Sequence, residues 1–488
     1  MIRSVQAACL ASSSPNLPHA AGAILLAAFV GGLTVSTNGA SFAWVGAGVA
    51  LAALCWAALT SASVWLLLYF VCVWLAPAFY VNMGNQETPI HAALLPLMLG
   101  VLTPLLQLEE VRIRSGESVL PASASFLLCL MISLPFAFWT AGFDVGLQSV
   151  QRFILVTQPF VVYAVIRMLG WVPESRSLSG IISVLLCLGG LSALFGVLDF
   201  YFRFPFEHPF AEQFIYLDGE KIRRAQGLFY EASSFGNMSA FLLALTFFRI
   251  YFRQRVSVTG TVILLGAAGI FTLALFLSYS RGSWLNFLVT AAVFLAIYRH
   301  RLFRTGLSLF VLLTAFIGIA YHFSPNVVLN FFDWRVAAPI REILVDPNFM
   351  TSGRLETWSR LFTVFADQPE LLLFGVGYKT LAYSHYFGQP MIADNAILSS
   401  LFETGLVGLL AFLSLNVSLL VTMNRIRRQA SAPVKWYASF LFAFWCGETA
   451  QMLTGDIFTY WRNMVVFFAL MALVLNLHEQ THTCRREK

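Results

Sequence analysis

Long apolar runs dominate this sequence and limit what the chain can fold into. A helix that spans a membrane needs about 20 consecutive, mainly apolar residues. Fourteen candidate runs of this kind begin near residues 20, 41, 61, 89, 122, 150, 180, 229, 258, 282, 305, 396, 433 and 460. The pattern predicts an all-α, polytopic integral membrane protein with about 14 transmembrane helices, within a range of roughly 12 to 14.

The composition excludes a soluble domain and gives no sign of a metal site. Of the 488 residues, 58% are hydrophobic and 11% are charged, whereas soluble domains are about 45–50% apolar and about 25% charged. The formal net charge of +6 reflects basic cytoplasmic loops better than nucleic-acid binding. The cysteines show no C-x-x-C spacing, and no D-x-D pair occurs. We therefore expect no metal, no cofactor and no nucleic-acid partner.

The distribution of basic residues predicts the orientation in the membrane. Cytoplasmic loops retain Lys and Arg, and a cytoplasmic N-terminus places 18 of the 30 basic residues on the inner side. Both termini are therefore expected in the cytoplasm, and two long loops, residues 202–228 and 324–393, on the outer face. The first 20 residues show no compact signal-peptide core, so the first helix is expected to direct insertion.

The 324–393 loop is expected to contain an amphipathic helix. Thr351 or Ser352 can cap its start. Apolar side chains then recur at helical spacing, namely Leu355, Trp358, Leu361, Phe362 and Phe365. One face of this helix can lie on the membrane or on the helix bundle.

The strongest local motif lies between two apolar runs on the outer side and reads Ser278-Tyr279-Ser280-Arg281-Gly282-Ser283-Trp284. Arg281 falls at the expected start of a helix, where free backbone N–H groups and the Ser280 and Ser283 hydroxyls would favour a phosphate. The alternative is an interfacial arginine that reaches lipid phosphates.

A second motif combines a basic pair with a carboxylate at a membrane entry. It comprises Arg223 and Arg224, followed by Glu231. Glu231 can pair with an arginine or bind a sugar hydroxyl, although helix-entry anchoring also explains the pattern.

A third motif gathers polar residues near residue 394. Gly375-Val376-Gly377-Tyr378 is followed by Asp394-Asn395 and then by Glu403-Thr404-Gly405. Asp394 can act as a general base at the membrane boundary or can simply cap the helix that follows. Arg354, in the outer loop, can pair with Glu356 or stack on Trp358. Alternatively, it adds a third cation to those of Arg224 and Arg281.

Over about residues 220–410, these motifs in this order resemble the O-antigen ligase and Wzy-type polymerase superfamily of bacterial polysaccharide assembly. The resemblance rests on Arg224-Ala225-Gln226-Gly227 before Glu231, the Ser280-Arg281-Gly282-Ser283-Trp284 turn, Ser352-Gly353-Arg354, Gly375-Val376-Gly377, Asp394-Asn395 and Glu403-Thr404-Gly405. The first 200 residues match only as a series of membrane helices.

The resemblance implies a metal-independent glycosyltransferase of the bacterial inner membrane with a periplasmic active site. Its donor would be an oligosaccharide on undecaprenyl pyrophosphate, held by Arg281 and Arg224 with help from Arg354. The other candidate substrate-binding residues are Arg223, Glu231, Ser280, Ser283, Asn395 and Tyr378. Ligases of this superfamily usually carry His-Asn where this chain has Asp394-Asn395, which favours a polymerase in which Asp394 deprotonates the incoming hydroxyl.

Three regions follow from this resemblance: N-terminal transmembrane helices in 1–201, an O-antigen ligase-like catalytic region in 202–423, and C-terminal transmembrane helices with a cytoplasmic tail in 424–488. The product would be O-antigen, capsule or exopolysaccharide. A chain-length regulator and a flippase are candidate partners besides the lipid-linked oligosaccharide and the bilayer.

Two alternatives remain: a ligase of the same fold for O-antigen or protein O-glycans, and a lipid-linked oligosaccharide transporter. Against the transporter, the ionisable groups gather at one face and no repeat is visible.

Overall fold

A computed structural model describes the chain over residues 53–59, 61–76, 78–83, 86–106, 118–172, 175–204, 213–217, 220–229, 231–252, 258–298, 314, 318, 321–322, 325–333, 337, 353–387 and 391–486. The chain divides into two compact units, Met1–Arg112 and Ile113–Lys488. The apolar runs expected near 20, 41 and 305 fall mainly outside the described residues.

The first unit contains a helix, a hairpin and a second helix. These are α4 (Ala62–Leu75), the antiparallel strands β1 (Ala78–Met83) and β2 (Gln86–His91), and α5 (Leu94–Leu106). Trp65 of α4 donates a hydrogen bond of 2.8 Å to the Pro96 carbonyl of α5. The run expected near residue 89 as one span is thus a strand followed by a 13-residue helix. Aromatic and β-branched residues such as Phe79 and Val81 favour the strand.

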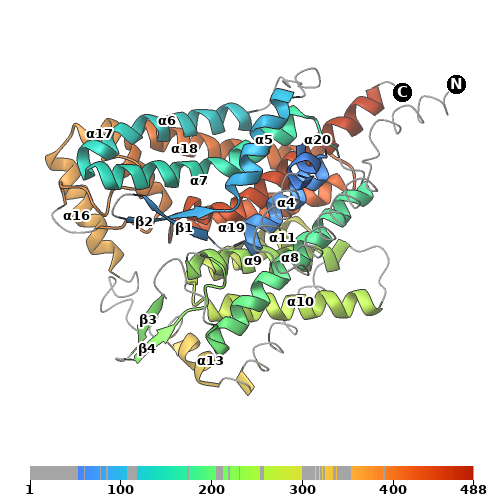
Figure 1. Ribbon diagram of the computed structural model, residues 1–488. Helices are drawn as coiled ribbons and strands as arrows, with labels where there is room; N and C mark the ends of the chain where they lie inside the picture. The colour runs from blue at the N-terminus through green and yellow to red at the C-terminus, as the bar shows by residue number, and fades with distance from the viewer. Residues whose placement is uncertain are drawn as a thin grey trace, which may run out of the picture. The chain divides into compact units, whose positions relative to one another are not determined.

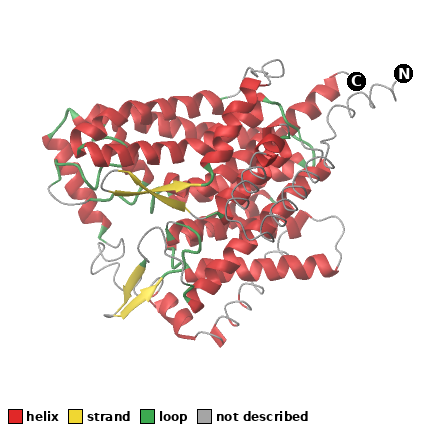
Figure 2. Cartoon of the chain, in the orientation of Figure 1, coloured by secondary structure: helices red, strands yellow, loops and turns green. Residues whose placement is uncertain are grey.

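The second unit is a helical bundle (Figure 1). Its principal elements are α6 (Val119–Ala141), α7 (Phe143–Met168), α8 (Ser175–Phe202), α9 (Ala232–Phe252), α10 (Val258–Leu277), α11 (Arg281–Ile297), α13 (Pro325–Phe332), α16 (Arg354–Asp367), α17 (Leu371–Phe374), α18 (Ala396–Gln429), α19 (Val434–Gln451), η4 (Ile457–Tyr460) and α20 (Trp461–Arg486). A short antiparallel hairpin joins β3 (Phe214–Leu217) to β4 (Glu220–Arg223). Figure 2 shows that helices make up most of the described chain.

Seven helices within the described residues are long and apolar enough to cross a membrane. They coincide with the runs expected near 122, 150, 180, 229, 258, 396 and 460, and α11 is a shorter apolar helix at the run expected near 282. This confirms the prediction of a helical, multi-pass membrane protein. The two short hairpins are the departure from an all-α chain, and the total of about fourteen spans stays a prediction.

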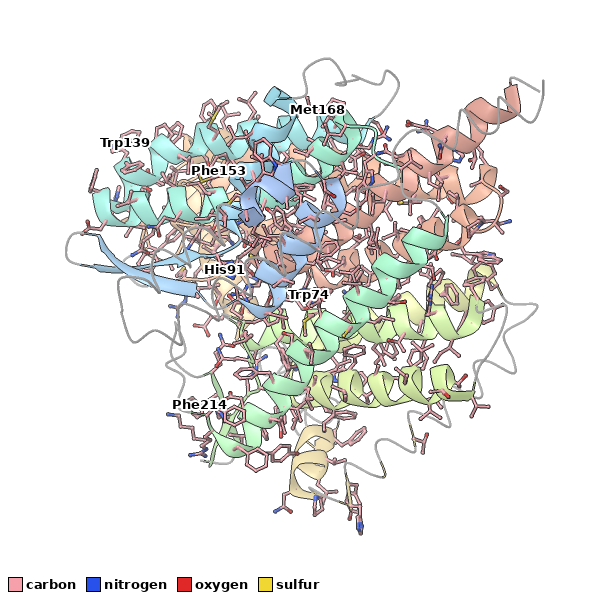
Figure 3. All side chains as sticks on the ribbon, turned by 45° about the vertical axis from the view of Figure 1, so that its right-hand side comes forward. Trp74, His91, Trp139, Phe153, Met168 and Phe214 are labelled. Carbon is pink, nitrogen blue, oxygen red and sulfur yellow. The ribbon has the colours of Figure 1, made fainter. Side chains whose placement is uncertain are left out.

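The burial of the helices separates a central element from peripheral ones. In the most apolar window of α20, 94% of the residues are buried inside the protein, against 33% in α6. Trp139, near the end of α6, is 74% exposed (Figure 3). An apolar side chain exposed on a bundle of this kind suits lipid, because hydrocarbon tails solvate it without cost.

Neighbouring helices pack along one another. In Figure 1, α6 and α7 lie beside α18, while α10 runs along α9. The helix α7 also packs on α20, and α19 packs on both α11 and α18.

One end of the bundle collects the helix ends that border the two long loops. The Ala225 N–H donates a 2.8 Å hydrogen bond to the Leu277 carbonyl at the end of α10, and the Ala396 N–H donates one of 2.8 Å to the Met452 carbonyl after α19. At the opposite end, Arg167 of α7 lies 2.6 Å from the Glu479 carboxylate of α20. The alternation of ends agrees with the predicted order of the spans, while the compartment that each end faces stays a prediction.

Candidate active site

The turn between α10 and α11 is fixed by its own serines. The Ser280 hydroxyl accepts a 3.3 Å hydrogen bond from the Ser283 N–H, and the two hydroxyls lie 2.8 Å apart. Ser280 is therefore the N-cap of α11. Both side chains are buried, so their observed function is to hold the turn, and direct contact with a substrate stays a prediction.

Arg281 is the first residue of α11, so its side chain leaves the helix at the positive end of the helix dipole. The helix α9 approaches this turn closely at Gly236, where an added Cβ would lie 2.6 Å from the Ser278 hydroxyl oxygen. A side chain at this position would therefore push the turn away from α9.

The segment before α9 places Arg224 against the same turn. Its Nε donates a 2.8 Å hydrogen bond to the Ser278 carbonyl, and its Nη2 lies 3.2 Å from the Ser233 hydroxyl. Arg224 also interacts electrostatically with Glu231 and Asp394. Arg224 and the Arg281 turn, 57 positions apart by number, are thus part of one local structure.

Arg223 is directed elsewhere. Its Nη2 lies 2.9 Å from the Asp199 carboxylate at the end of α8, and its Nη1 donates a 2.8 Å hydrogen bond to the Asp199 carbonyl. The pair is buried, so Arg223 anchors the loop to α8 while the adjacent Arg224 faces the turn. A substrate contact by Arg223 stays a prediction.

Arg354, the first residue of α16, lies beside Asp394. Its Nε and Nη2 are both 3.4 Å from Asp394 Oδ2. The indole N–H of Trp358 donates a 2.7 Å hydrogen bond to the Ala393 carbonyl, which ties α16 to the segment before α18. Arg354 also interacts electrostatically with Arg281. The two guanidinium groups repel each other, and the Asp394 carboxylate offsets the charge of Arg354.

Asn395, rather than Asp394, caps α18. Its Oδ1 accepts hydrogen bonds from the Ile397 and Leu398 N–H groups at 3.0 and 3.1 Å. Asp394 has a positive φ of 47° and a side chain that is 52% exposed. The helix cap that was one interpretation of Asp394 is therefore provided by Asn395. The Asp394 carboxylate instead faces solvent and Arg354.

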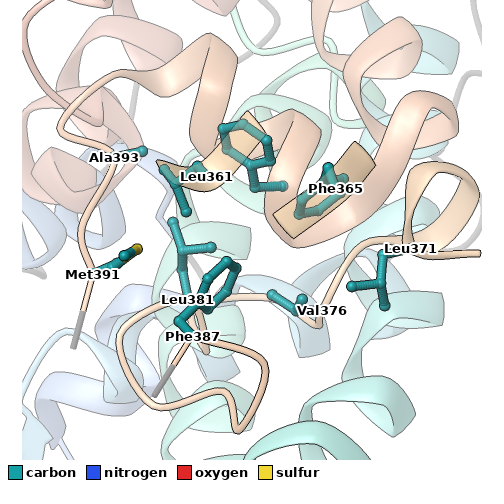
Figure 4. Close-up of a cluster of buried hydrophobic side chains, with 9 residues drawn as sticks. Leu361, Phe365, Leu371, Val376, Leu381, Phe387, Met391 and Ala393 are labelled. Carbon is teal, nitrogen blue, oxygen red and sulfur yellow. The ribbon is translucent and has the colours of Figure 1, made fainter. Parts of the chain in front are cut away.

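An apolar cluster beneath α16 holds this segment in place. Its members, seen in Figure 4, are Leu361, Phe365, Leu371, Val376, Leu381, Phe387, Met391, Ala393 and Phe402. Leu361 and Phe365 are buried, whereas Leu355 and Phe362 are at least 40% exposed. One face of the expected amphipathic helix therefore packs on the bundle. The helix begins after Gly353, which has a φ of 80°, and the expected caps Thr351 and Ser352 lie outside the described residues.

Tyr378 and the residue after it contribute differently to the site. The Tyr378 ring is buried, and its carbonyl accepts a hydrogen bond from the Ser149 hydroxyl of α7. Lys379 pairs with Asp456, the N-cap of η4, and its carbonyl accepts a 3.3 Å hydrogen bond from Arg152. Burial alone lowers the pKa of the Lys379 ammonium group, but Asp456 and Glu403 raise it more, so the net pKa is raised.

Glu231 lies among these charges. Burial raises the pKa of its carboxyl group to about 7. The positive charge of Lys379 opposes this shift, while Asp456 and Asp394 add to it. A carboxyl group with this pKa exchanges a proton readily at neutral pH.

Sequence reasoning missed Lys379 and Asp456. Lys379 was detectable as a lysine next to Tyr378 in the Gly375-Val376-Gly377-Tyr378 motif, but nothing in the sequence connects it with Asp456, 77 positions later. Three of the four non-glycine residues with positive φ in the described part of the chain are Tyr279, Lys379 and Asp394. Such strained backbone tends to occur at functional sites. Within the described ranges, no group of three or more His, Cys, Asp or Glu residues could hold a metal ion.

The site therefore gathers arginine side chains and carboxyl groups at one end of a membrane bundle. Residues 266–413 match the family model described as O-antigen ligase. The predicted resemblance to the O-antigen ligase and Wzy-type superfamily is thereby confirmed, and the match supports a membrane enzyme of this type. No curated protein matches the chain.

Proposed function

We propose that the protein is a polysaccharide polymerase that joins undecaprenyl-pyrophosphate-linked oligosaccharide repeat units at the periplasmic face of the bacterial inner membrane. The observation that carries this proposal is that Arg354 contacts Asp394, while Arg224 interacts electrostatically with Asp394 and Arg281 with Arg354. The polymer would serve as O-antigen, capsule or exopolysaccharide, and both termini would be cytoplasmic.

The chemistry follows from the charges. Transfer of a sugar breaks the bond between its anomeric carbon and a phosphate oxygen, so negative charge develops on the departing pyrophosphate. Arg224, Arg281 and Arg354 would stabilise that charge. Asp394, whose half-exposed carboxylate faces the same place, would accept the proton of the acceptor hydroxyl as the new glycosidic bond forms. No step in this scheme calls for a metal or a nucleotide sugar.

The test is to supply purified protein in lipid nanodiscs with lipid-linked repeat units alone. A polymerase converts them into a ladder of products that grow by one repeat. Arg281→Ala and Asp394→Ala should abolish the ladder while the protein stays inserted and abundant. Normal-length polymer from both variants would overturn the assignment.

A ligase is the second candidate, because the matching family model is described as O-antigen ligase. A ligase would leave the repeat units unjoined until an acceptor such as lipid A core or a protein is added, and would then make one transfer. Movement of the donor across vesicle membranes without new glycosidic bonds would instead indicate a transporter. A chain-length regulator and a flippase would act with a polymerase, and co-purification tests their association.

A further inference from the structure

We propose that Glu231 is a second catalytic carboxyl group, which donates a proton to the departing phosphate oxygen while Asp394 accepts the proton of the acceptor hydroxyl. This inference rests on the proposed function and divides its acid and base roles between two carboxyl groups. Four observations support it, concerning the local backbone, the surrounding charges, the ionisation of Glu231 and the neighbouring phosphate-binding candidate.

The carboxyl group of Glu231 is not needed to build the start of α9. The first N–H of that helix, at Ala232, donates a 2.9 Å hydrogen bond to the side-chain oxygen of Gln213. Glu231 itself contributes its backbone carbonyl, which accepts a 3.1 Å hydrogen bond from the Phe235 N–H. Because Gln213 caps the start of α9, anchoring of the helix entry does not explain the Glu231 side chain.

Charged groups from several elements surround this carboxyl group. Arg224 precedes it in the same loop, Lys379 and Asp394 come from the segments before α18, and Asp456 comes from the N-cap of η4. Tyr460, at the end of η4, also interacts electrostatically with Glu231. Lys379 is itself neutralised by Asp456. Among the described residues, Arg224 supplies the other positive charge that interacts with Glu231.

The two carboxyl groups differ in their surroundings. Asp394 is half exposed and has one oxygen 3.4 Å from two nitrogens of Arg354. Glu231 is recessed, and burial raises its pKa to about 7. A pair of carboxyl groups in which one is exposed beside an arginine and the other is recessed and exchanges its proton near neutral pH is suited to simultaneous base and acid catalysis.

The neighbouring arginine determines which reacting atom Glu231 would meet. Arg224 is anchored by its Nε to the Ser278 carbonyl and directs its Nη2 toward Ser233, in the first turn of α9. A phosphate bound to this guanidinium lies at the N-terminus of α9, next to Glu231. Because Glu231 interacts electrostatically with Arg224, we assign it to the leaving group, and we assign Asp394, which contacts Arg354, to the acceptor hydroxyl.

The proton and bond changes balance. The acceptor O–H bond breaks and its proton passes to the Asp394 carboxylate as the acceptor oxygen bonds to the anomeric carbon. The bond between that carbon and the phosphate oxygen breaks, its electron pair stays on the oxygen, and the proton of Glu231 moves to that oxygen. Solvent then returns a proton to Glu231 and removes one from Asp394.

The pH dependence of Glu231→Gln tests this assignment, with purified full-length protein in nanodiscs and lipid-linked repeat units as substrate. Because the protonated form of Glu231 is required, the wild-type rate should fall as the pH rises above about 7. Glu231→Gln should lower the rate by about 10²-fold or more and remove that decline. Glu231→Asp should recover part of the rate. Glu356→Gln, on the exposed face of α16, is the matched control and should keep both the rate and the pH profile.

The outcomes separate this inference from the proposed function. A wild-type protein that makes no polymer contradicts the proposed function. If the wild type is active and Glu231→Gln has the same rate and the same pH profile, the inference alone is overturned. It is also overturned if Glu231→Gln removes a decline of the rate at low pH instead of the decline above about pH 7. Stabilisation by added undecaprenyl pyrophosphate, measured as a thermal shift, should persist in Glu231→Gln. Loss of that shift would make Glu231 a binding residue and would also overturn the inference.

Discussion

Asp394 and Asn395 are adjacent in the chain, but their side chains serve different structures. Asn395 Oδ1 accepts hydrogen bonds of 3.0 and 3.1 Å from the first N–H groups of α18, whereas Asp394 Oδ2 lies 3.4 Å from two nitrogens of Arg354. The cap fixes the helix start, and the positive φ of Asp394 turns its carboxylate away from that cap. Stability and chemistry can therefore be separated at neighbouring positions.

Substitutions at these two positions should have opposite effects. Asp394→Asn keeps the left-handed backbone, which asparagine tolerates, but removes the proposed base, so the rate should fall by about 10²–10⁴-fold with an unchanged thermal midpoint. Asn395→Ala should lower the free energy of unfolding by about 1 kcal/mol and leave most of the rate. Polymer assays and thermal unfolding measure the two effects. Equal loss of rate in both variants would refute the division.

Arg354 and Arg360 lie on the same helix and offer a matched pair. Arg354 contacts Asp394, whereas Arg360 pairs with Glu356 on an exposed face of α16. Arg354→Ala should lower the rate by about 10²–10³-fold, the usual effect of removing one charge-stabilising group. Arg360→Ala should stay within about twofold, because exposed ion pairs contribute little. Similar rates for the two variants would place Arg354 outside the reaction.

Much of the bundle could be predicted from the sequence because a membrane span is a local property. About 20 apolar residues suffice to define one, so runs such as those near 122, 258 and 396 match observed helices. The hairpin of Ala78–His91 was not predicted, since short strands with aromatic and β-branched residues resemble the ends of apolar helices. The hairpin of Phe214–Arg223 was not predicted either, and it lies within the loop expected over 202–228.

The site could be predicted only as far as residue type allowed. Arginines and acids at membrane boundaries indicated Arg224, Arg281 and Asp394, because a charge there must have a partner or a function. Adjacent residues of the same type could not be distinguished: the sequence does not reveal that Arg223 pairs with Asp199 while Arg224 faces the turn. Such choices depend on tertiary contacts between distant segments.

Gly405 is required by a close approach between α18 and α17. Its φ is 70°, and an added Cβ would lie 2.1 Å from the Leu373 carbonyl oxygen. Gly405→Ala should lower the free energy of unfolding by at least about 2 kcal/mol, from backbone strain and overpacking. Gly266→Ala, in α10, meets nothing within 4 Å and should be neutral or up to about 1 kcal/mol more stable. Thermal unfolding in detergent compares the two, and a neutral Gly405→Ala would contradict the packing described.

A buried amide network connects four helices beneath the site. Asn237 of α9 donates hydrogen bonds of 2.7 and 2.9 Å to Glu448 and Gln451 of α19. Its own carbonyl oxygen accepts one of 2.8 Å from Asn463 of α20, and Asn286 of α11 donates one of 3.0 Å to Gln451. The network joins α9 and α11 through α19, so it also holds the start of α9 and the turn before α11 in place.

Asn237→Ala removes the residue that this network shares and leaves buried polar groups on α19 and α20 with fewer partners. An unsatisfied buried group costs about 1–3 kcal/mol, and a hydrogen bond between membrane helices contributes about 0.6 kcal/mol on average. Because Asn237 makes three such hydrogen bonds, the expected loss in the free energy of unfolding is about 1–3 kcal/mol. Thr246→Ala, on the same helix, is the control, since the Thr246 hydroxyl donates its 2.7 Å hydrogen bond to Leu242 within α9 and should cost less than about 1 kcal/mol. Unfolding in the same detergent measures the stability of both variants. Because the network holds α9 against α19, Asn237→Ala should also lower the polymerisation rate, while Thr246→Ala should leave it unchanged. Equal stability of the two variants would mean that the network does not hold these helices together.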